Sequence, residues 1–201
     1  MFLSIILRLS LSIGFTVAHN QVWHHSVLRS EKALKSENNP DYAFPTPPFM
    51  ATVIPSFISK WECMNAAYRS SMEDVCVVCP ALQNDSDIFF AALMDGHGGC
   101  ATASFVASRI GENLGKALHE KDLNAVEDQI RYAFLLTDVE CRMANLMASG
   151  STCACVLIMR DKSSGSCTLY TANIGDSRVV LFSNGKAMRI SCVCVDRMRY
   201  G

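Results

Sequence analysis

The sequence feature that most constrains the fold is an apolar run that ends in an acidic, glycine-rich segment. Residues 88–94 read IFFAALM and residues 95–99 read DGHGG. The run is typical of a buried strand, and the glycines allow the Gly96 carbonyl to turn toward a cation that the Asp95 carboxylate binds. His97 would lie beside that cation with an ionisable ring. Taken alone, an Asp-Gly segment after a strand is more often an ordinary turn, so the interpretation depends on the neighbouring segments.

Three further motifs surround this segment. Residues 69–74 read RSSMED, residues 149–152 read SGST, and residues 172–178 read ANIGDSR. In this order, R-x-x-M-E-D, D-G-H-G-G, G-S-T and G-D-S-R resemble the motifs of the metal-dependent protein serine/threonine phosphatases of the PP2C (PPM) family. The resemblance runs over residues 61–191 approximately, and the combination of motifs is far more specific than any one of them.

The resemblance implies a metal site with at least two Mg or Mn ions when complete. Glu73, Asp95 and the Gly96 carbonyl would hold one ion, and Asp95 would bridge to a second. Asp176 would help to hold a further, weaker metal. Carboxylate and carbonyl oxygens are hard ligands, which suit both metals.

The resemblance also implies a phosphoprotein substrate. Arg69 would bind the substrate phosphate, for which its planar guanidinium is suited. His97 would act as general acid toward the leaving alkoxide. Read without the resemblance, Arg69 and Glu73 form a surface ion pair, and Asp176 is a turn residue after Gly175.

Two other polar residues in these motifs have simpler interpretations. Asp74 is expected to cap or hydrogen-bond a nearby turn. Thr152 is expected to place a structural hydroxyl beneath the site.

The sequence departs from the family pattern after residue 191. The family continues through a D-G-x-x-D segment and a D-N pair that complete the second metal's ligands, whereas residues 192–201 read CVCVDRMRYG. We therefore expect the 201-residue chain to encode half of the binuclear site and to have little or no phosphatase activity by itself. Two alternatives stay open: an inactive phosphatase-like interaction protein or truncated product, and a secreted or membrane-anchored effector.

Composition limits the other function classes. The chain has 201 residues, of which 50% are hydrophobic and 18% charged, and its net charge is -1. A chain of this kind can bury one sizeable core. Because the sequence has no basic stripe, a nucleic-acid partner is disfavoured.

Residues 1–18 are a candidate signal peptide or signal-anchor. The segment is mostly apolar and ends in Thr16-Val17-Ala18, but Arg8 interrupts it and it is short for a membrane span. A secretory or membrane-anchored location follows if it acts as a signal, and a cytoplasmic one otherwise; any membrane contact would be through this segment. Residues 19–60 are rich in Pro, Ser and Asn and predict an extended linker. Residues 61–201 would form the partial phosphatase domain.

The cysteines are interpreted as buried thiols in strands. The chain has ten, and most of those in strand-like runs occupy positions typical of small apolar residues: Cys76, Cys79, Cys153, Cys155, Cys167, Cys192 and Cys194. The C-x-x-C spacing at Cys76 and Cys79 lacks a second pair, so a plain strand is favoured over a zinc or redox site.

The apolar periodicity predicts an α+β fold. Helical spacing covers residues 98–119 and 123–147. Strand patterns cover residues 75–79, 88–94, 153–159, 167–174, 178–182 and 186–190. Asn184-Gly185 between two strands is a strong hairpin signal. Strands, two adjacent helices and further strands suit a layered fold, which agrees with the PP2C β-sandwich flanked by helices, here incomplete at the C-terminus.

Overall fold

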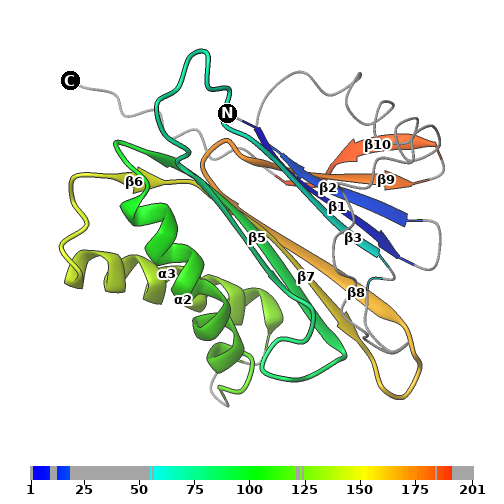
Figure 1. The fold of residues 1–201 in the computed structure, drawn as a ribbon. Helices are drawn as coiled ribbons and strands as arrows, with labels where there is room; N and C mark the ends of the chain where they lie inside the picture. The colour runs from blue at the N-terminus through cyan, green and yellow to red at the C-terminus, as the bar shows by residue number, and fades with distance from the viewer. Residues whose placement is uncertain are drawn as a thin grey trace, which may run out of the picture. The chain divides into compact units, whose positions relative to one another are not determined.

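The computed structural model describes residues 2–9, 13–18, 55, 57–120, 123, 125–183 and 185–191. These residues form two antiparallel sheets and two helices (Figure 1). Sheet A has the order β10-β9-β2-β1-β3 and sheet B the order β4-β5-β7-β8, with the short β6 paired to the end of β5. The elements are β1 (Phe2–Leu9), β2 (Ile13–Ala18), β3 (Phe57–Cys63), β4 (Asp74–Cys79), β5 (Ile88–His97), α2 (Ala101–Ala117), α3 (Val126–Met143), β6 (Gly150–Ser151), β7 (Cys153–Arg160), β8 (Cys167–Ile174), β9 (Arg178–Ser183) and β10 (Lys186–Arg189).

Strand β5 contributes to two hydrophobic cores because its side chains alternate between the two faces of sheet B. Phe89, Ala91 and Leu93 pack with the inward residues of β7 and with Val179 of β9, which joins sheet B to sheet A. The intervening side chains of β5 pack against the helices. All six residues 89–94 are completely buried, so the strand is apolar on both faces, as its uninterrupted apolar run predicts.

The helices cover the face of sheet B that points away from sheet A. Ala103, Ile110 and Leu114 of α2 belong to the same core as the even-numbered residues of β5. Helix α3 lies against α2 and adds Ile130 and Ala133 to that core. Both helices fall within the ranges that their apolar spacing predicts. The α+β prediction is therefore confirmed.

The first residues of the chain are strands in this structure. β1 pairs with β3 and β2 pairs with β9, both antiparallel, so the two strands lie in the middle of sheet A. Strand β3 begins at Phe57, before the predicted domain boundary at residue 61. Among the described helices, none is long and apolar enough to cross a bilayer. The signal-peptide or anchor interpretation of residues 1–18 remains a prediction.

The interpretation of the cysteines as buried thiols is correct for Cys153 and Cys155, holds in part for the half-buried Cys76 and Cys79, and is wrong for Cys167. Cys153 and Cys155 are buried in β7, and Cys76 and Cys79 are free thiols within the single strand β4. Burial raises the pKa of Cys76 to about 11. Cys167 is exposed. It is the first residue of the edge strand β8, next to the turn of the β7–β8 hairpin, and it pairs with Arg160. Cys192 and Cys194 lie outside the described residues.

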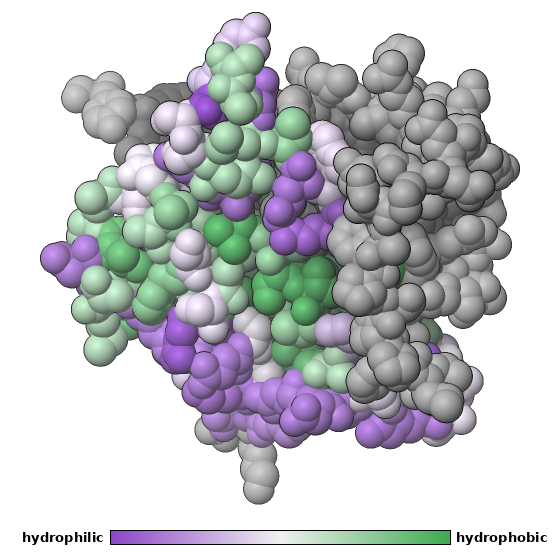
Figure 2. Space-filling model, viewed as in Figure 1, coloured by the Kyte–Doolittle hydropathy of each residue, from purple (hydrophilic) through white to green (hydrophobic). Residues whose placement is uncertain are grey.

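Strand β4 forms one edge of sheet B, and its residues 75–79 are only half-buried. Figure 2 shows hydrophobic residues exposed in the middle of the viewed face and a band of hydrophilic residues along its lower edge. A cavity of about 310 Å³ lies between β4 and α2 and is lined in part by Val77, Leu82 and Gly111. Its lining is mainly apolar and holds no cluster of titratable groups.

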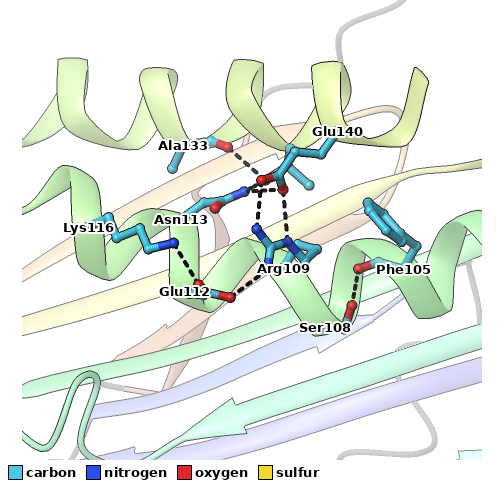
Figure 3. A network of polar contacts seen from close by, with 9 residues as sticks. Phe105, Ser108, Arg109, Glu112, Asn113, Lys116, Ala133 and Glu140 are labelled. Atoms are coloured by element: carbon cyan, nitrogen blue, oxygen red, sulfur yellow. Dashed lines mark hydrogen bonds and ion pairs between the residues drawn. The ribbon is translucent and has the colours of Figure 1, made fainter. Parts of the chain in front are cut away.

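A polar network fixes α2 to α3 (Figure 3). Arg109 donates two hydrogen bonds to the Glu140 carboxylate, at 3.0 and 2.7 Å. The Asn113 amide donates to Glu140 at 2.8 Å and to the Thr137 hydroxyl at 3.0 Å. Bidentate pairing of this kind is stronger than an ordinary surface ion pair. The network therefore holds the two helices in register over sheet B.

Replacing Glu140 with Gln should destabilise the protein near neutral pH by roughly 1–3 kcal/mol, the range for hydrogen bonds to charged groups. Hydrogen bonds from Arg109 and then Asn113 lower the pKa of Glu140 to about 2, from 4.5. A carboxyl with a lowered folded pKa contributes stability above its unfolded pKa and loses it as pH falls through the folded value. The difference between wild type and variant should thus shrink between about pH 5 and pH 2, as measured by urea unfolding.

Asp128→Asn is the matched control, because it removes an exposed ion pair to Arg131 on the same helix. It should cost less than about 1 kcal/mol. A Glu140→Gln effect that is small at neutral pH, or that stays constant into acid, would contradict the prediction.

Candidate functional site

The site begins where β4 and β5 pair at one end of sheet B. In the antiparallel register Asp74 lies opposite Asp95. The next backbone hydrogen bond runs from the Gly96 amide to the Glu73 carbonyl at 3.1 Å. Two chain segments that are separate in the sequence thus bring three carboxylates and the Gly96 carbonyl to one end of the sheet.

Gly96 is required here because the two segments approach closely. A Cβ atom built on Gly96 would lie 2.5 Å from the Glu73 carbonyl oxygen and 3.2 Å from the Ala103 Cβ. The first neighbour is backbone and cannot rotate away. Any side chain at this position would separate the end of β5 from Glu73 or from α2.

Asp74 is the most unusual group of the site. It is only 5% exposed, and neither of its carboxylate oxygens has a hydrogen-bond partner within the described part of the chain. Burial, followed by repulsion from Asp95, raises the pKa of Asp74 to about 7, and the protonated carboxyl can donate a hydrogen bond to Asp95. The positive charge of Arg69 opposes this shift. A buried carboxyl that lies opposite a second carboxylate favours either a shared proton or a bound cation.

His97 ends β5 and is exposed. β6 pairs with this end of β5, so that Gly96 lies opposite Ser151 and His97 opposite Gly150. The imidazole lies directly over Gly150, where a Cβ atom would overlap its Nε2. The absence of a side chain at residue 150 therefore makes room for the ring at the rim of the site.

A second connection runs from Asp95 to the turn between β8 and β9. The Thr152 amide donates to the Asp95 carbonyl at 2.9 Å, and the Asp95 amide donates to the Thr152 hydroxyl at 3.1 Å. The Thr152 and Ser177 hydroxyl oxygens are 2.6 Å apart. Asp176, which precedes Ser177, is exposed in that turn. Thr152 thus has the structural position beneath the site that its motif predicts.

Arg69 is exposed in the loop before β4. The amides of Tyr68 and Arg69 both donate to the Asn65 carbonyl, at 2.9 and 3.2 Å, which forms a turn around Asn65. Asn65 has a φ of 55°, a value that asparagine tolerates better than most residues. Arg69 acts on the site through its charge, since it lowers the pKa of Asp74.

Comparison with known families identifies the domain to which this site belongs. The family model for Protein phosphatase 2C matches residues 61–192, which is more than half of the chain. The chain belongs to the protein phosphatase 2C family. The match includes all four motifs, and it confirms the resemblance that the sequence indicates.

Curated PP2C relatives match the same region. The chain is 31% identical to Probable protein phosphatase 2C 74 of Oryza sativa subsp. japonica, over 65% of this chain and 34% of that protein. It is 30% identical to Protein phosphatase 2C homolog 1 of Saccharomyces cerevisiae, over 65% and 50%. It is 33% identical to Protein phosphatase 2C homolog 1 of Schizosaccharomyces pombe, over 68% and 41%. The matched region thus spans between about a third and half of these PP2C proteins.

A solved structure supports the PP2C-like fold. It is described as the structure of a C. elegans sex determining protein, and it superimposes with a TM-score of 0.54 at 26% sequence identity. The superposition covers 62% of this chain and 32% of that one. The superposed part of this chain therefore shares its fold with part of a known protein structure.

The PP2C family implies Mg or Mn, and the donor chemistry of the site fits such an ion. The available groups are carboxylate and carbonyl oxygens, and the Asp74 carboxylate is buried without a hydrogen-bond donor in the described residues. Within the same residues, however, no three His, Cys, Asp or Glu side chains converge closely enough to enclose an ion. The described PP2C segment therefore supplies suitable ligands without forming a closed cage.

The motifs predict most of this arrangement but miss the role of Asp74. Glu73, Asp95 and Gly96 lie at one end of sheet B, and the turn of Asp176 is bonded to Asp95 through Ser177 and Thr152. Asp74 is no turn cap, because it faces Asp95 across the ladder. The sequence places acidic residues at the ends of two strand-like runs, but only the strand register shows that Asp74 is the one opposite Asp95.

Gly96→Ala should open the end of β5 and weaken metal binding. The new Cβ would meet the Glu73 carbonyl, and relieving that overlap should cost roughly 1–3 kcal/mol of stability. We expect the affinity for Mn²⁺, measured by isothermal titration, to fall at least about tenfold, because ligands on both strands would separate.

Gly111→Ala is the control for this substitution. A Cβ at Gly111 in α2 would make only ordinary contacts, the nearest at 3.7 Å. It should therefore stabilise the helix, by up to about 1 kcal/mol, and leave Mn²⁺ affinity unchanged. Equal metal affinities for the two glycine variants would rule out a special role for the close approach at Gly96.

Proposed function

We propose that the chain forms part of a PP2C-type active site that hydrolyses phosphoserine and phosphothreonine in proteins with Mg or Mn. The observation that carries this proposal is the pairing of Asp74 with Asp95 beside the Glu73–Gly96 contact, inside a segment that matches the PP2C family. Because the chain spans half or less of the relatives named above, the activity of the whole protein belongs to the proposal.

The reaction requires charge neutralisation first. A phosphate monoester dianion repels anionic nucleophiles, and bound divalent cations would neutralise its oxygens and supply hydroxide near neutral pH. Glu73, Asp95 and the Gly96 carbonyl would hold these ions, with Asp95 shared between two of them. Asp176 would contribute to a further, weaker metal. The exposed position of Asp176 suits a weakly bound ion.

Two side chains would act on the substrate itself. The Arg69 guanidinium is exposed beside the site, and its fork of donors would orient the phosphoryl oxygens. His97 lies at the exposed end of β5 over Gly150, where it could donate a proton to the alkoxide oxygen of the leaving serine or threonine. No cysteine nucleophile takes part, and the buried thiols of β7 are unreactive because burial raises the pKa of Cys155 to about 12.

Asp95→Asn tests the metal-dependent reaction. This chain by itself should hydrolyse a phosphothreonine peptide very slowly or not at all in millimolar Mn²⁺. In a longer protein that supplies the remaining metal ligands, Asp95→Asn should lose turnover on the order of 100-fold or more, since one substitution weakens a ligand shared by two ions. Asp138→Asn, at an exposed ion pair with Arg142 on α3, should leave turnover unchanged. Hydrolysis that needs no divalent metal, or that survives in Asp95→Asn, would count against the proposal.

His97→Ala tests the proton donor. Turnover of a phosphoserine peptide should fall by about 100-fold or more, because an alkoxide needs protonation as it departs. Hydrolysis of p-nitrophenyl phosphate should change little, because its leaving group departs as a stable anion. Comparing the two substrates on one enzyme preparation separates the chemistry from folding, and equal losses on both would assign His97 an orienting role instead.

A further inference from the structure

We infer that Thr152 and Ser177 form a positioning pair that fixes the Asp95 backbone relative to the turn carrying Asp176. The inference rests on the proposed function only for its activity readout. Its structural content is that two hydroxyl groups connect β5, the start of β7 and the β8–β9 turn. Neither residue is placed in contact with substrate.

Thr152 holds both backbone polar groups of Asp95. Its amide donates to the Asp95 carbonyl, and its hydroxyl oxygen accepts from the Asp95 amide. The hydroxyl bond is available only to a residue with a side-chain oxygen at this position. The backbone of Asp95 is therefore oriented by a single residue, Thr152, which lies between β6 and β7.

Ser177 extends this connection to the second turn. Its side chain is completely buried, and its hydroxyl oxygen lies 2.6 Å from that of Thr152, so either group can donate. A buried hydroxyl that loses its partner destabilises the folded state. Because Asp176 directly precedes Ser177, the position of Asp176 relative to Asp95 depends on this bond.

The methyl group of Thr152 has a separate contact. Gly175 has a φ of 90°, and a Cβ built on it would lie 2.7 Å from the Thr152 Cγ2. The β8–β9 turn therefore packs directly on the methyl group, while the hydroxyl faces Asp95 and Ser177. Thr152 combines a packing contact and a polar contact that substitution can separate.

Three variants of the full chain separate the two contacts. Thr152→Val keeps a branched side chain and removes the hydroxyl, Thr152→Ser keeps the hydroxyl and removes the methyl, and Ser177→Ala removes only the partner hydroxyl. The first readout is amide hydrogen exchange at Asp95 and Asp176, measured by NMR without metal. The second is Mn²⁺ affinity, and the third is turnover.

We expect exchange at the Asp95 amide to be at least tenfold faster in Thr152→Val than in wild type, and within about threefold of wild type in Thr152→Ser. Ser177→Ala should shift the Asp176 amide signal and lower Mn²⁺ affinity severalfold. The double variant Thr152→Val with Ser177→Ala should lose no more affinity than Thr152→Val alone, because both changes break one connection.

Thr137→Val is the control for loss of a buried hydroxyl. Thr137 lies in α3, and its hydroxyl donates to the Ala133 carbonyl and accepts from Asn113. This variant should lose comparable stability yet leave exchange at Asp95 and Mn²⁺ affinity unchanged.

Unchanged Asp95 exchange in Thr152→Val overturns the inference, as do strictly additive losses of affinity in the double variant. If Thr152→Val does not fold, Ser177→Ala decides through the Asp176 signal, and an unmoved signal overturns the inference. Failure of the proposed function has a different signature: neither wild type nor any variant binds Mn²⁺, while the exchange pattern at Asp95 persists.

Discussion

The register of β5 against β4 is the constraint on which the rest of the structure depends. β5 is buried on both faces, so its odd-numbered side chains fill the core against sheet A and its even-numbered ones the core against the helices. A shift by one residue would exchange these two sets. The same shift would remove Asp95 from Asp74 and Gly96 from Glu73. Core packing therefore fixes the geometry of the site.

This arrangement carries an electrostatic cost in the absence of a cation. A buried carboxyl with a raised pKa, such as Asp74, weakens the folded state as pH rises through the range between its unfolded and folded pKa values. A site that binds a divalent cation recovers this cost on binding, because the cation favours the ionised form. The pairing of Asp74 with Asp95 is therefore unfavourable when both carboxyls are ionised, and a proton or a cation would relieve it.

Many of the helices and strands could be predicted from local sequence patterns, but the pairing of the strands with one another could not. The runs at residues 88–94 and 153–159 are apolar enough to predict buried strands, and α2 and α3 show helical spacing. Residues 2–9 and 13–18 form strands here, although an apolar segment at that position is equally typical of a signal. Asp74 was missed because only the strand register shows which of two adjacent acidic residues faces Asp95. The strand pattern predicts that Cys167 is buried, and only the hairpin geometry shows that the first residue of β8 is exposed to solvent.

The glycines of the motifs have a common physical explanation. Gly96 lies against the Glu73 carbonyl, Gly150 beneath the His97 ring, and Gly175 against the Thr152 methyl group. In each case a glycine of one motif makes room for an atom of another motif. The requirement for glycine in one motif therefore depends on the motif that packs against it. Hydrogen bonds to the backbone then hold these contacts in place, including both bonds between Thr152 and Asp95. The site is consequently positioned by contacts between distant segments, and the side chains of Arg69, His97 and Asp176 are exposed around it.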